Sequence, residues 1–295
     1  MINSQLYGLG TALVTPFKQD GEIDFPALDA LVDNQIKGGA DYLVVLGTTS
    51  EAATMTQDEK KQVINAIVKR NNRQLPLVLG LGGNNTKALI NEIDSLKDIL
   101  TDNFSAILSV CPYYNKPSQE GLYRHFKAVA EASPVPVILY NVPGRTGVNM
   151  LPETVSRLHN DCKMIAGVKE ASGNVEQIER IIQLTKGLQP FLVISGDDGI
   201  TAELMDKGAA GLISVASNAF PEIFHRIVSE HNHALQEKYA NIVRLLFKEG
   251  NPSGIKTVLA HKHLIENVLR LPLVSNSQAV QDEIAAELNL LEEAG

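Results

Sequence analysis

The sequence predicts an α/β fold: a (β/α)8 barrel, or TIM barrel, with a C-terminal helical extension. Eight short apolar runs rich in β-branched residues recur about every 30 residues, the spacing of βα units, and helical patterns separate them. After about residue 231 these runs stop and only helical patterns follow. We therefore expect a catalytic barrel over residues 1–231 and a helical domain over 232–295. A doubly wound open sheet is the alternative.

The predicted strands are apolar along nearly their whole length. A strand with one solvent-exposed face alternates apolar and polar residues. These runs are instead almost continuously apolar, as in parallel strands that are covered on both faces. They occupy residues 10–15, 42–46, 76–80, 106–110, 135–140, 164–168, 191–195 and 211–215.

The predicted helices have apolar residues at a 3.6-residue period and polar residues that cap their first turns. Thr56 with Glu59 forms a capping-box pattern, and Asn174 with Gln177 forms a weaker one. Gly250-Asn251-Pro252 and Leu271-Pro272-Leu273 interrupt the helical pattern of the extension. The helices expected from these signals include 57–71, 86–100, 234–248, 253–268 and 277–291.

Charge and cysteine content exclude several classes of protein. With 26 basic and 34 acidic residues, the formal charge is −8, which argues against a nucleic-acid partner. No apolar run approaches the ~20 residues of a membrane span, and residues 1–10 lack the pattern of a signal peptide. Cys111 and Cys162 form no CxxC pair, so we expect buried thiols and a cytoplasmic location.

A lysine ends the sixth predicted strand, where TIM barrels place their active sites. Apolar or small residues precede Lys169, so the barrel should enclose its stem. Desolvation favours the neutral amine, which can attack a carbonyl and form a Schiff base. The alternative is a lysine that reaches solvent or pairs with Glu170. The position on a barrel strand favours catalysis.

Other strand ends supply tyrosines and threonines for proton transfer. Tyr140 ends the fifth strand, Tyr113 and Tyr114 follow the fourth, and Thr48 and Thr49 follow the second. A tyrosine linked to a threonine hydroxyl can shuttle the protons that a Schiff-base enzyme needs. The alternatives are a core tyrosine with a satisfied hydroxyl and threonines that cap a helix.

An arginine in a Pro-Gly turn lies on the same rim. Arg145 gives an anionic protein a local guanidinium, which is suited to a substrate carboxylate. The alternative is a solvated loop arginine.

The sequence predicts no metal and no nucleotide cofactor. The glycine-rich residues 80–83 lack the third glycine of a dinucleotide fingerprint. The histidine pairs at 231 and 233 and at 261 and 263 have i,i+2 spacing, and such residues do not share a helical face.

Three stretches together resemble one enzyme family: Pro112-Tyr-Tyr-Asn-Lys-Pro-Ser-Gln-Glu-Gly121, Tyr140-Asn-Val-Pro-Gly-Arg-Thr-Gly147 and Gly167-Val-Lys-Glu-Ala-Ser172. The chain resembles the 4-hydroxy-tetrahydrodipicolinate synthase (dihydrodipicolinate synthase) family. That family belongs to the pyruvate-dependent Schiff-base lyase superfamily, which includes N-acetylneuraminate lyase. Arg145 and the Tyr113-Tyr114 pair resemble the synthase more than the sialic-acid lyase. The alternatives are that lyase, a keto-deoxy sugar acid aldolase, or a non-enzymatic barrel that binds pyruvate-like metabolites.

The resemblance implies a role for each catalytic residue. Lys169 would form a Schiff base with pyruvate, and Tyr140 would donate and accept protons. Thr48 and Tyr114 would complete the relay, with Tyr114 reaching in from a neighbouring subunit. The resemblance further implies a homotetramer built of dimers and chemistry with no metal or organic cofactor.

The resemblance also implies substrate contacts. Thr49 and the main chain of Ile213 would hold the pyruvate carboxylate, and Gly196 belongs with the substrate-binding residues. Arg145 would hold the carboxylate of L-aspartate 4-semialdehyde. The reaction would be the first committed step of the diaminopimelate route to lysine.

Two positions depart from the family pattern. Ser50 stands where the family usually has glycine, so a left-handed residue there would strain the loop. Lysine-inhibited members carry a histidine and a glutamate in their feedback site, where this chain has Gln57 and Ala88. We therefore expect weak or absent inhibition by lysine.

Overall fold

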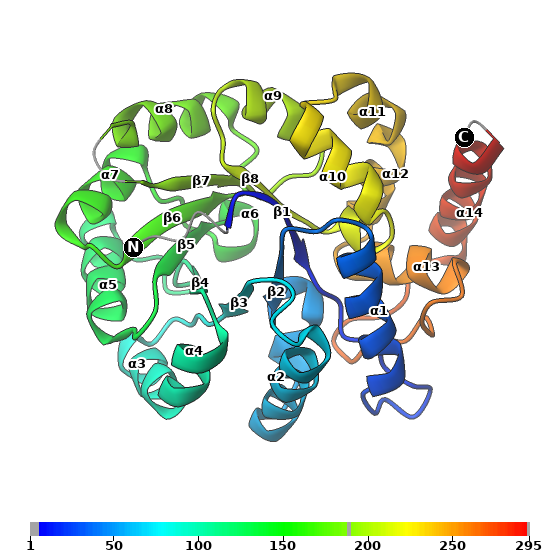
Figure 1. The fold of residues 1–295 in the computed structure, drawn as a ribbon, viewed down its shortest axis with the longest axis horizontal. Helices are drawn as coiled ribbons and strands as arrows, with labels where there is room; N and C mark the ends of the chain where they lie inside the picture. The colour runs from blue at the N-terminus through cyan, green and yellow to red at the C-terminus, as the bar shows by residue number, and fades with distance from the viewer. Residues whose placement is uncertain (1–5, 188–189, 294–295) are drawn as a thin grey trace.

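The computed structural model describes residues 6–187 and 190–293. Within these residues, eight parallel strands follow one another in chain order and close into a barrel, which confirms the predicted TIM barrel and excludes the open sheet (Figure 1). The strands are β1 (Gly8–Ala12), β2 (Tyr42–Val45), β3 (Leu77–Gly80), β4 (Ala106–Val110), β5 (Val137–Asn141), β6 (Ile165–Glu170), β7 (Leu192–Ser195) and β8 (Gly211–Ser214).

Helices surround the barrel, and short helical turns follow some of the strands (Figure 1). The surrounding helices are α1 (Phe25–Lys37), α2 (Gln57–Asn71), α3 (Thr86–Ser95), α4 (Lys97–Asn103), α5 (Gln119–Ala132), α7 (Pro152–Asp161), α8 (Val175–Thr185), α9 (Thr201–Asp206) and α10 (Pro221–Glu230). The short turns are η2 (Thr48–Ser50), η3 (Ala52–Thr54), α6 (Pro143–Thr146) and η4 (Ala216–Asn218). The capping box of Thr56 with Glu59 is present at the start of α2.

Alternate residues of a strand belong to separate apolar clusters on its two faces, as β2 shows. Tyr42 and Val44 of β2 belong to the inner cluster, while Leu43 and Val45 pack beneath the helices. Both faces of the strand are therefore buried, which explains the continuous apolar runs in the sequence. Gly10 leaves room for the Tyr42 ring, because an added Cβ would lie 2.2 Å from a ring carbon.

The strand register places the proposed nucleophile beside a tyrosine. Tyr140 of β5 is the direct partner of Lys169 of β6, and Lys169 is the partner of Ile194 of β7. Parallel strands end at the same rim of the barrel, so the residues that follow them surround one mouth.

Two of the predicted helices are each broken into two. The segment predicted at 86–100 bends at Leu96, which lets Ile93 and Leu100 both be fully buried on either side of the bend. The segment predicted at 234–248 bends at Tyr239, whose ring packs edge-on against Phe220 with centroids 5.4 Å apart. Neither bend has a proline or glycine to mark it, so the helical period alone could not predict it.

The C-terminal helices pack onto one side of the barrel (Figure 1). Residues from β1, β8 and α10 share one apolar cluster with the C-terminal helices, so the proposed boundary at residue 231 stays a prediction. These helices are α11 (His233–Lys238), α12 (Ala240–Phe247), α13 (Ser253–His261) and α14 (Gln278–Glu293).

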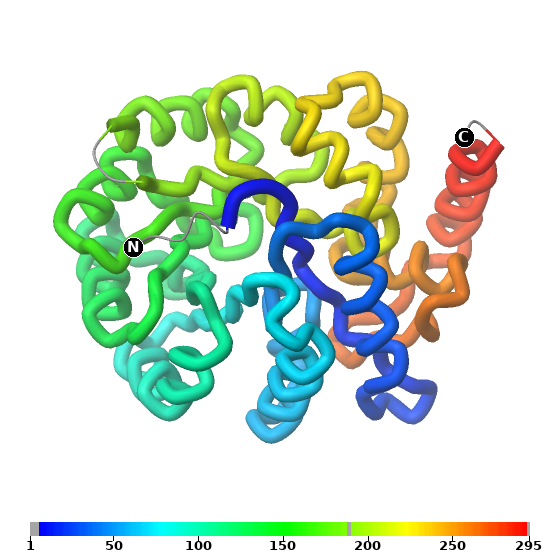
Figure 2. The backbone as a smooth tube through the Cα atoms, in the orientation of Figure 1, coloured from blue at the N-terminus to red at the C-terminus, as the bar shows by residue number. Residues whose placement is uncertain are grey.

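The segment between α13 and α14 is irregular, although the sequence predicted helix as far as residue 268. It runs back toward the start of α2, as the orange part of the tube in Figure 2 shows. Arg270 fixes it there by donating hydrogen bonds to the Gly21 carbonyl and by an ion pair with Glu59. These long-range contacts replace the helical hydrogen bonds that the local pattern favoured.

No helix within the described ranges combines the length and apolar character required to cross a bilayer.

Phe224→Ala tests whether the extension and the barrel share one core. Phe224 is fully buried in the shared cluster, so its removal should lower the free energy of unfolding by about 3–5 kcal/mol. The exposed Leu290 provides a control, and Leu290→Ala should change the free energy by less than about 0.5 kcal/mol. Urea unfolding followed by circular dichroism measures both. Similar losses in the two variants would contradict the shared core.

Candidate active site

A cavity of about 670 Å³ opens at the rim formed by the C-terminal ends of the strands. Loops from opposite sides of the barrel and two segments of the C-terminal extension line it. The predicted site residues that line it are Thr48, Thr49, Tyr140, Arg145, Lys169 and Gly196. The fold thus gathers side chains that are far apart in the sequence into one site.

Lys169 lies at the bottom of this site with its stem enclosed. Only 6% of the residue is exposed, and its Nζ lies 4.5 Å from the centroid of the Tyr140 ring. Its stem passes Gly196, where an added Cβ would lie 3.0 Å from Lys169 Cε. The amine therefore faces the cavity beside a phenol, which is the arrangement a Schiff-base lysine and its proton donor require.

Glu170 does not form an ion pair with Lys169, although the alternative interpretation of Lys169 required one. Its carboxylate accepts hydrogen bonds from Asn141 Nδ2 at 2.9 Å and from the main-chain NH of Ser172 at 2.8 Å. Burial raises the pKa of Glu170, and these hydrogen bonds oppose that rise. Successive side chains of a strand point to opposite faces, so Lys169 is directed into the barrel and Glu170 away from it.

The loop after β2 carries the two threonines. Thr48 is exposed to the cavity, while Thr49 is buried and its Oγ1 accepts a hydrogen bond of 3.1 Å from Asn251 Nδ2. Ser50 does not have a left-handed backbone, whereas its neighbour Glu51 does, with φ 58°. Ser50 instead donates a hydrogen bond of 2.7 Å to the Gly47 carbonyl, so the serine places no strain of that kind on the loop.

Arg145 lies on the opposite side of the mouth, in the short helix α6. Its guanidinium donates a hydrogen bond of 3.2 Å to the main-chain carbonyl of Asn251. The side chain remains exposed at the cavity, so a carboxylate can still reach it. Asn251 thus contacts both walls of the mouth.

Two predicted site residues lie outside the cavity of this single chain. Tyr114 is 89% exposed and adopts a left-handed φ of 73°, whereas its neighbour Tyr113 lines the cavity. Ile213 is fully buried in β8 and is not among the lining residues, although Val215 farther along is.

A sequence model of the Dihydrodipicolinate synthetase family matches residues 5–291. The chain belongs to this family.

Curated relatives and solved structures agree with the family match. The 4-hydroxy-tetrahydrodipicolinate synthase of Flavobacterium psychrophilum is 50% identical over 96% of each chain, and that of Parabacteroides distasonis is 47% identical over 99% of each. Dihydrodipicolinate synthase from Thermotoga maritima superposes with a TM-score of 0.93 at 37% identity, over 98% of this chain and 99% of that one. The Acinetobacter baumannii enzyme, solved with pyruvate, gives 0.92 at 38% identity, over 97% and 99%.

The histidine pairs at 231 and 233 and at 261 and 263 are not among the residues that line the cavity. Among the residues that the structure describes, no group of three or more His, Cys, Asp or Glu side chains is arranged to hold a metal ion. His231 and His233 nevertheless converge, since both contact the Asp206 carboxylate, at 2.9 and 2.7 Å. The i,i+2 argument was wrong here, because His231 ends α10 in a left-handed conformation and the pair does not share one helix.

The sequence did not predict that the C-terminal extension helps to form the active-site cavity. Phe247, Asn251, Pro252, Pro272 and Leu273 all line the cavity. The signals in the sequence were the two breaks at residues 250–252 and 271–273, which could be interpreted only as interruptions of the helical pattern. Nothing in the local pattern indicated that these breaks return to the mouth of the barrel.

Gly196→Ala should damage the site at Lys169. The new methyl would lie 2.6 Å from Ala171 Cβ and 3.0 Å from Lys169 Cε, so the lysine stem must shift. We expect the rate of synthesis to fall about 10- to 100-fold, as for other small displacements of a reacting group.

Gly83→Ala is the matched control, because an added Cβ there meets no atom within 4 Å. Steady-state assays without lysine compare the two variants. Full activity of Gly196→Ala would show that the stem of Lys169 does not need this space.

Proposed function

We propose that the chain condenses pyruvate with L-aspartate 4-semialdehyde to give 4-hydroxy-tetrahydrodipicolinate, with Lys169 as the Schiff-base residue. The observation that carries this assignment is the enclosed Lys169 amine facing the cavity beside Tyr140. The names of relatives at 45–50% identity favour the synthase over N-acetylneuraminate lyase or a keto-deoxy sugar acid aldolase.

The chemistry follows from the enclosed Lys169 amine that faces the cavity. The Lys169 amine attacks the ketone carbon of pyruvate, and water leaves to give an imine. Loss of a methyl proton gives an enamine, whose carbon adds to the aldehyde and forms the new C–C bond. The amino group derived from the semialdehyde then attacks the imine carbon. Ring closure displaces Lys169 and regenerates the free amine.

The other residues divide into proton carriers and substrate holders. Tyr140 exchanges protons at the imine, and Thr48 and Tyr114 link it to solvent. Thr49, Gly196 and the main chain at Ile213 bind the pyruvate end. Arg145 binds the semialdehyde carboxylate with its exposed guanidinium. Neither a metal nor an organic cofactor takes part in this proposal.

Tyr114 supports an assembly in which one subunit completes the site of another. Its side chain projects outward from its own chain, so a relay through it needs a neighbouring copy. We propose a homotetramer made of two such dimers. One structural relative, with a TM-score of 0.94 and 37% identity over 98% of each chain, is described as a monomeric variant. The cytoplasmic location stays a prediction.

Borohydride trapping tests the proposed function. Pyruvate plus borohydride should reduce the imine and leave a stable adduct, and peptide mass spectrometry should find it on Lys169. Lys169→Ala should trap no pyruvate and should lose nearly all synthesis.

A substrate panel separates the synthase from its alternatives. Product should form with L-aspartate 4-semialdehyde and not with sugar aldehydes. An adduct on another residue, or turnover of sugars alone, would contradict the assignment. Thermal stabilisation by pyruvate without turnover would favour the non-enzymatic barrel.

The enzyme should respond weakly or not at all to L-lysine. Gln57 and Ala88 line a second hollow of about 460 Å³ beside the active site, and Ala88 offers no carboxylate to an ammonium group. A related structure from Cyanidioschyzon merolae contains bound lysine. Initial rates with millimolar lysine should stay near those without it. Ala88→Glu supplies a carboxylate at an exposed position and should increase inhibition.

Sub-millimolar inhibition of the wild-type enzyme would contradict this expectation. The carboxylate would then have to come from another residue, and Glu92, which lines the same hollow, is the residue to replace next.

A further inference from the structure

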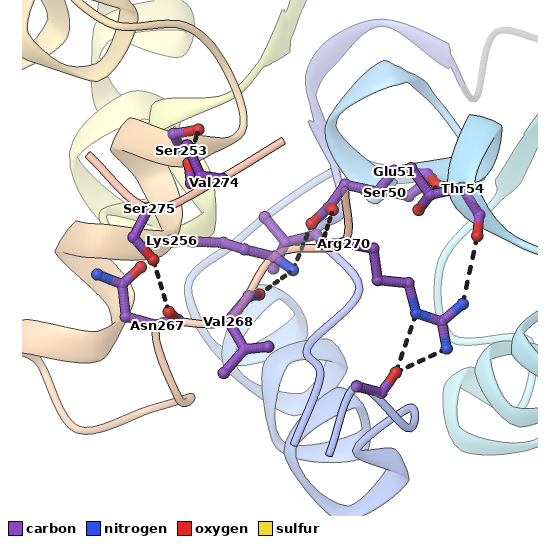
Figure 3. Close-up of polar contacts among 12 residues, drawn as sticks. Ser50, Glu51, Thr54, Ser253, Lys256, Asn267, Val268, Arg270, Val274 and Ser275 are labelled. Carbon is purple, nitrogen blue, oxygen red and sulfur yellow. Dashed lines mark hydrogen bonds and ion pairs between the residues drawn. The ribbon is translucent and has the colours of Figure 1, made fainter. Parts of the chain in front are cut away.

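A fully buried ion pair joins the C-terminal extension to the loop that carries Thr48 and Thr49. Lys256 Nζ of α13 lies 2.5 Å from Glu51 Oε1, and both side chains are 0% exposed (Figure 3). Glu51 follows Thr49 by two residues and separates the turns η2 and η3. The pair therefore acts on the backbone that presents both threonines to the cavity.

The extension holds both oxygens of the Glu51 carboxylate. Oε2 accepts a hydrogen bond of 3.0 Å from the main-chain NH of Arg270, while Oε1 faces Lys256. Glu51 also has a left-handed backbone, a conformation that is unfavourable in a residue with a Cβ. A residue in such a conformation persists only when its surroundings fix it, and here the extension supplies those surroundings.

Lys256 is fixed equally firmly. Its Nζ donates a hydrogen bond of 3.0 Å to the Val268 carbonyl and lies 4.2 Å from the centroid of the Phe17 ring, as Figure 3 shows in part. Arg270 covers the same ring and pairs with Glu59. Burial lowers the pKa of Lys256 to about 8, although Glu51 opposes that change.

Stability alone is a poor reason to keep such a pair. Replacing a buried ion pair with apolar side chains of similar volume is often neutral or stabilising, because both ions lose their hydration. We therefore attribute the Lys256–Glu51 pair to the loop geometry that it fixes and not to stability. Here a second contact from the same extension, Asn251 Nδ2 to Thr49 Oγ1, fixes the loop as well.

We propose that Lys256 is a positioning residue for the synthase reaction: through its ion pair with Glu51 it holds Thr48 and Thr49 in place over the pyruvate site beside Lys169. The inference rests on the proposed function. Lys256 itself touches neither substrate. Its contribution is the placement of one threonine on the pyruvate carboxylate and of the other in the proton relay.

Lys256→Met tests the proposal, because it keeps the length of the side chain and removes the charge. We expect kcat/KM for pyruvate, and the rate of borohydride trapping at Lys169, to fall about 10- to 100-fold. The KM for the semialdehyde, held by Arg145 across the mouth, should change by less than about threefold. A general loss of structure would not separate the two substrates in this way.

Two further variants separate positioning from stability. Lys256→Met with Glu51→Gln leaves no unpaired buried charge, so its melting temperature should recover toward wild type while trapping stays slow. Leu288→Ala lowers stability from a buried position on α14 that is not among the residues lining the cavity, and it should keep wild-type kinetics below its melting temperature. Circular dichroism fixes the assay temperature for all variants.

The outcomes distinguish this inference from the proposed function. Trapping by Lys256→Met at the wild-type rate, or activity that returns in step with melting temperature in the double variant, would overturn the positioning role alone. Equal kinetic losses in Leu288→Ala would overturn it too. Wild-type enzyme that traps no pyruvate would overturn the proposed function, and this inference with it.

Discussion

The closed ladder of parallel strands is the constraint on which the site depends. Within the described ranges each strand pairs on both sides, so no strand can slip without disturbing the whole ring. That register places Tyr140 directly beside Lys169 and directs both side chains into the barrel. The aliphatic interior then encloses the lysine stem and leaves its amine at the mouth. The ladder itself thus positions the proposed nucleophile and its proposed proton donor, before any loop contributes.

The proposed substrate contacts depend on loops as well as on the strand ladder. The loops after β2 and β5 carry Thr48, Thr49 and Arg145, and loops have no ladder to fix them. Here Asn251 contacts both of them, through Thr49 Oγ1 and through the Arg145 guanidinium. The C-terminal extension therefore acts as a brace across the mouth. It also helps explain how a protein of charge −8 can receive two carboxylate substrates, since it anchors a guanidinium at the rim of the cavity.

The sequence predicted those features that local patterns control. Eight apolar runs predicted the eight strands of the described chain, and six of the eight predicted site residues line the cavity. The bends at Leu96 and Tyr239 and the irregular course after His261 were missed, because tertiary packing determines them. The tie between Arg270 and Glu51 spans 219 residues of sequence, and no periodicity or spacing indicates which distant charges will meet. Lys256 and Glu51 therefore became functional candidates only in three dimensions.

Residues in the loops at the mouth of the barrel have strained backbone conformations. Leu46, Glu51 and Tyr114 all have positive φ values, and they lie in loops that follow β2 and β4. A left-handed leucine, glutamate or tyrosine is costly, so each must be held by contacts that favour it more strongly. Glu51 has such contacts within its own chain, from Lys256 and the Arg270 main chain. The exposed Tyr114 side chain does not line its own cavity, which is what a residue that completes the site of a neighbouring copy requires. The C-terminal extension thus holds the strained residue Glu51, whereas the side chain of the strained residue Tyr114 projects outward from its own chain.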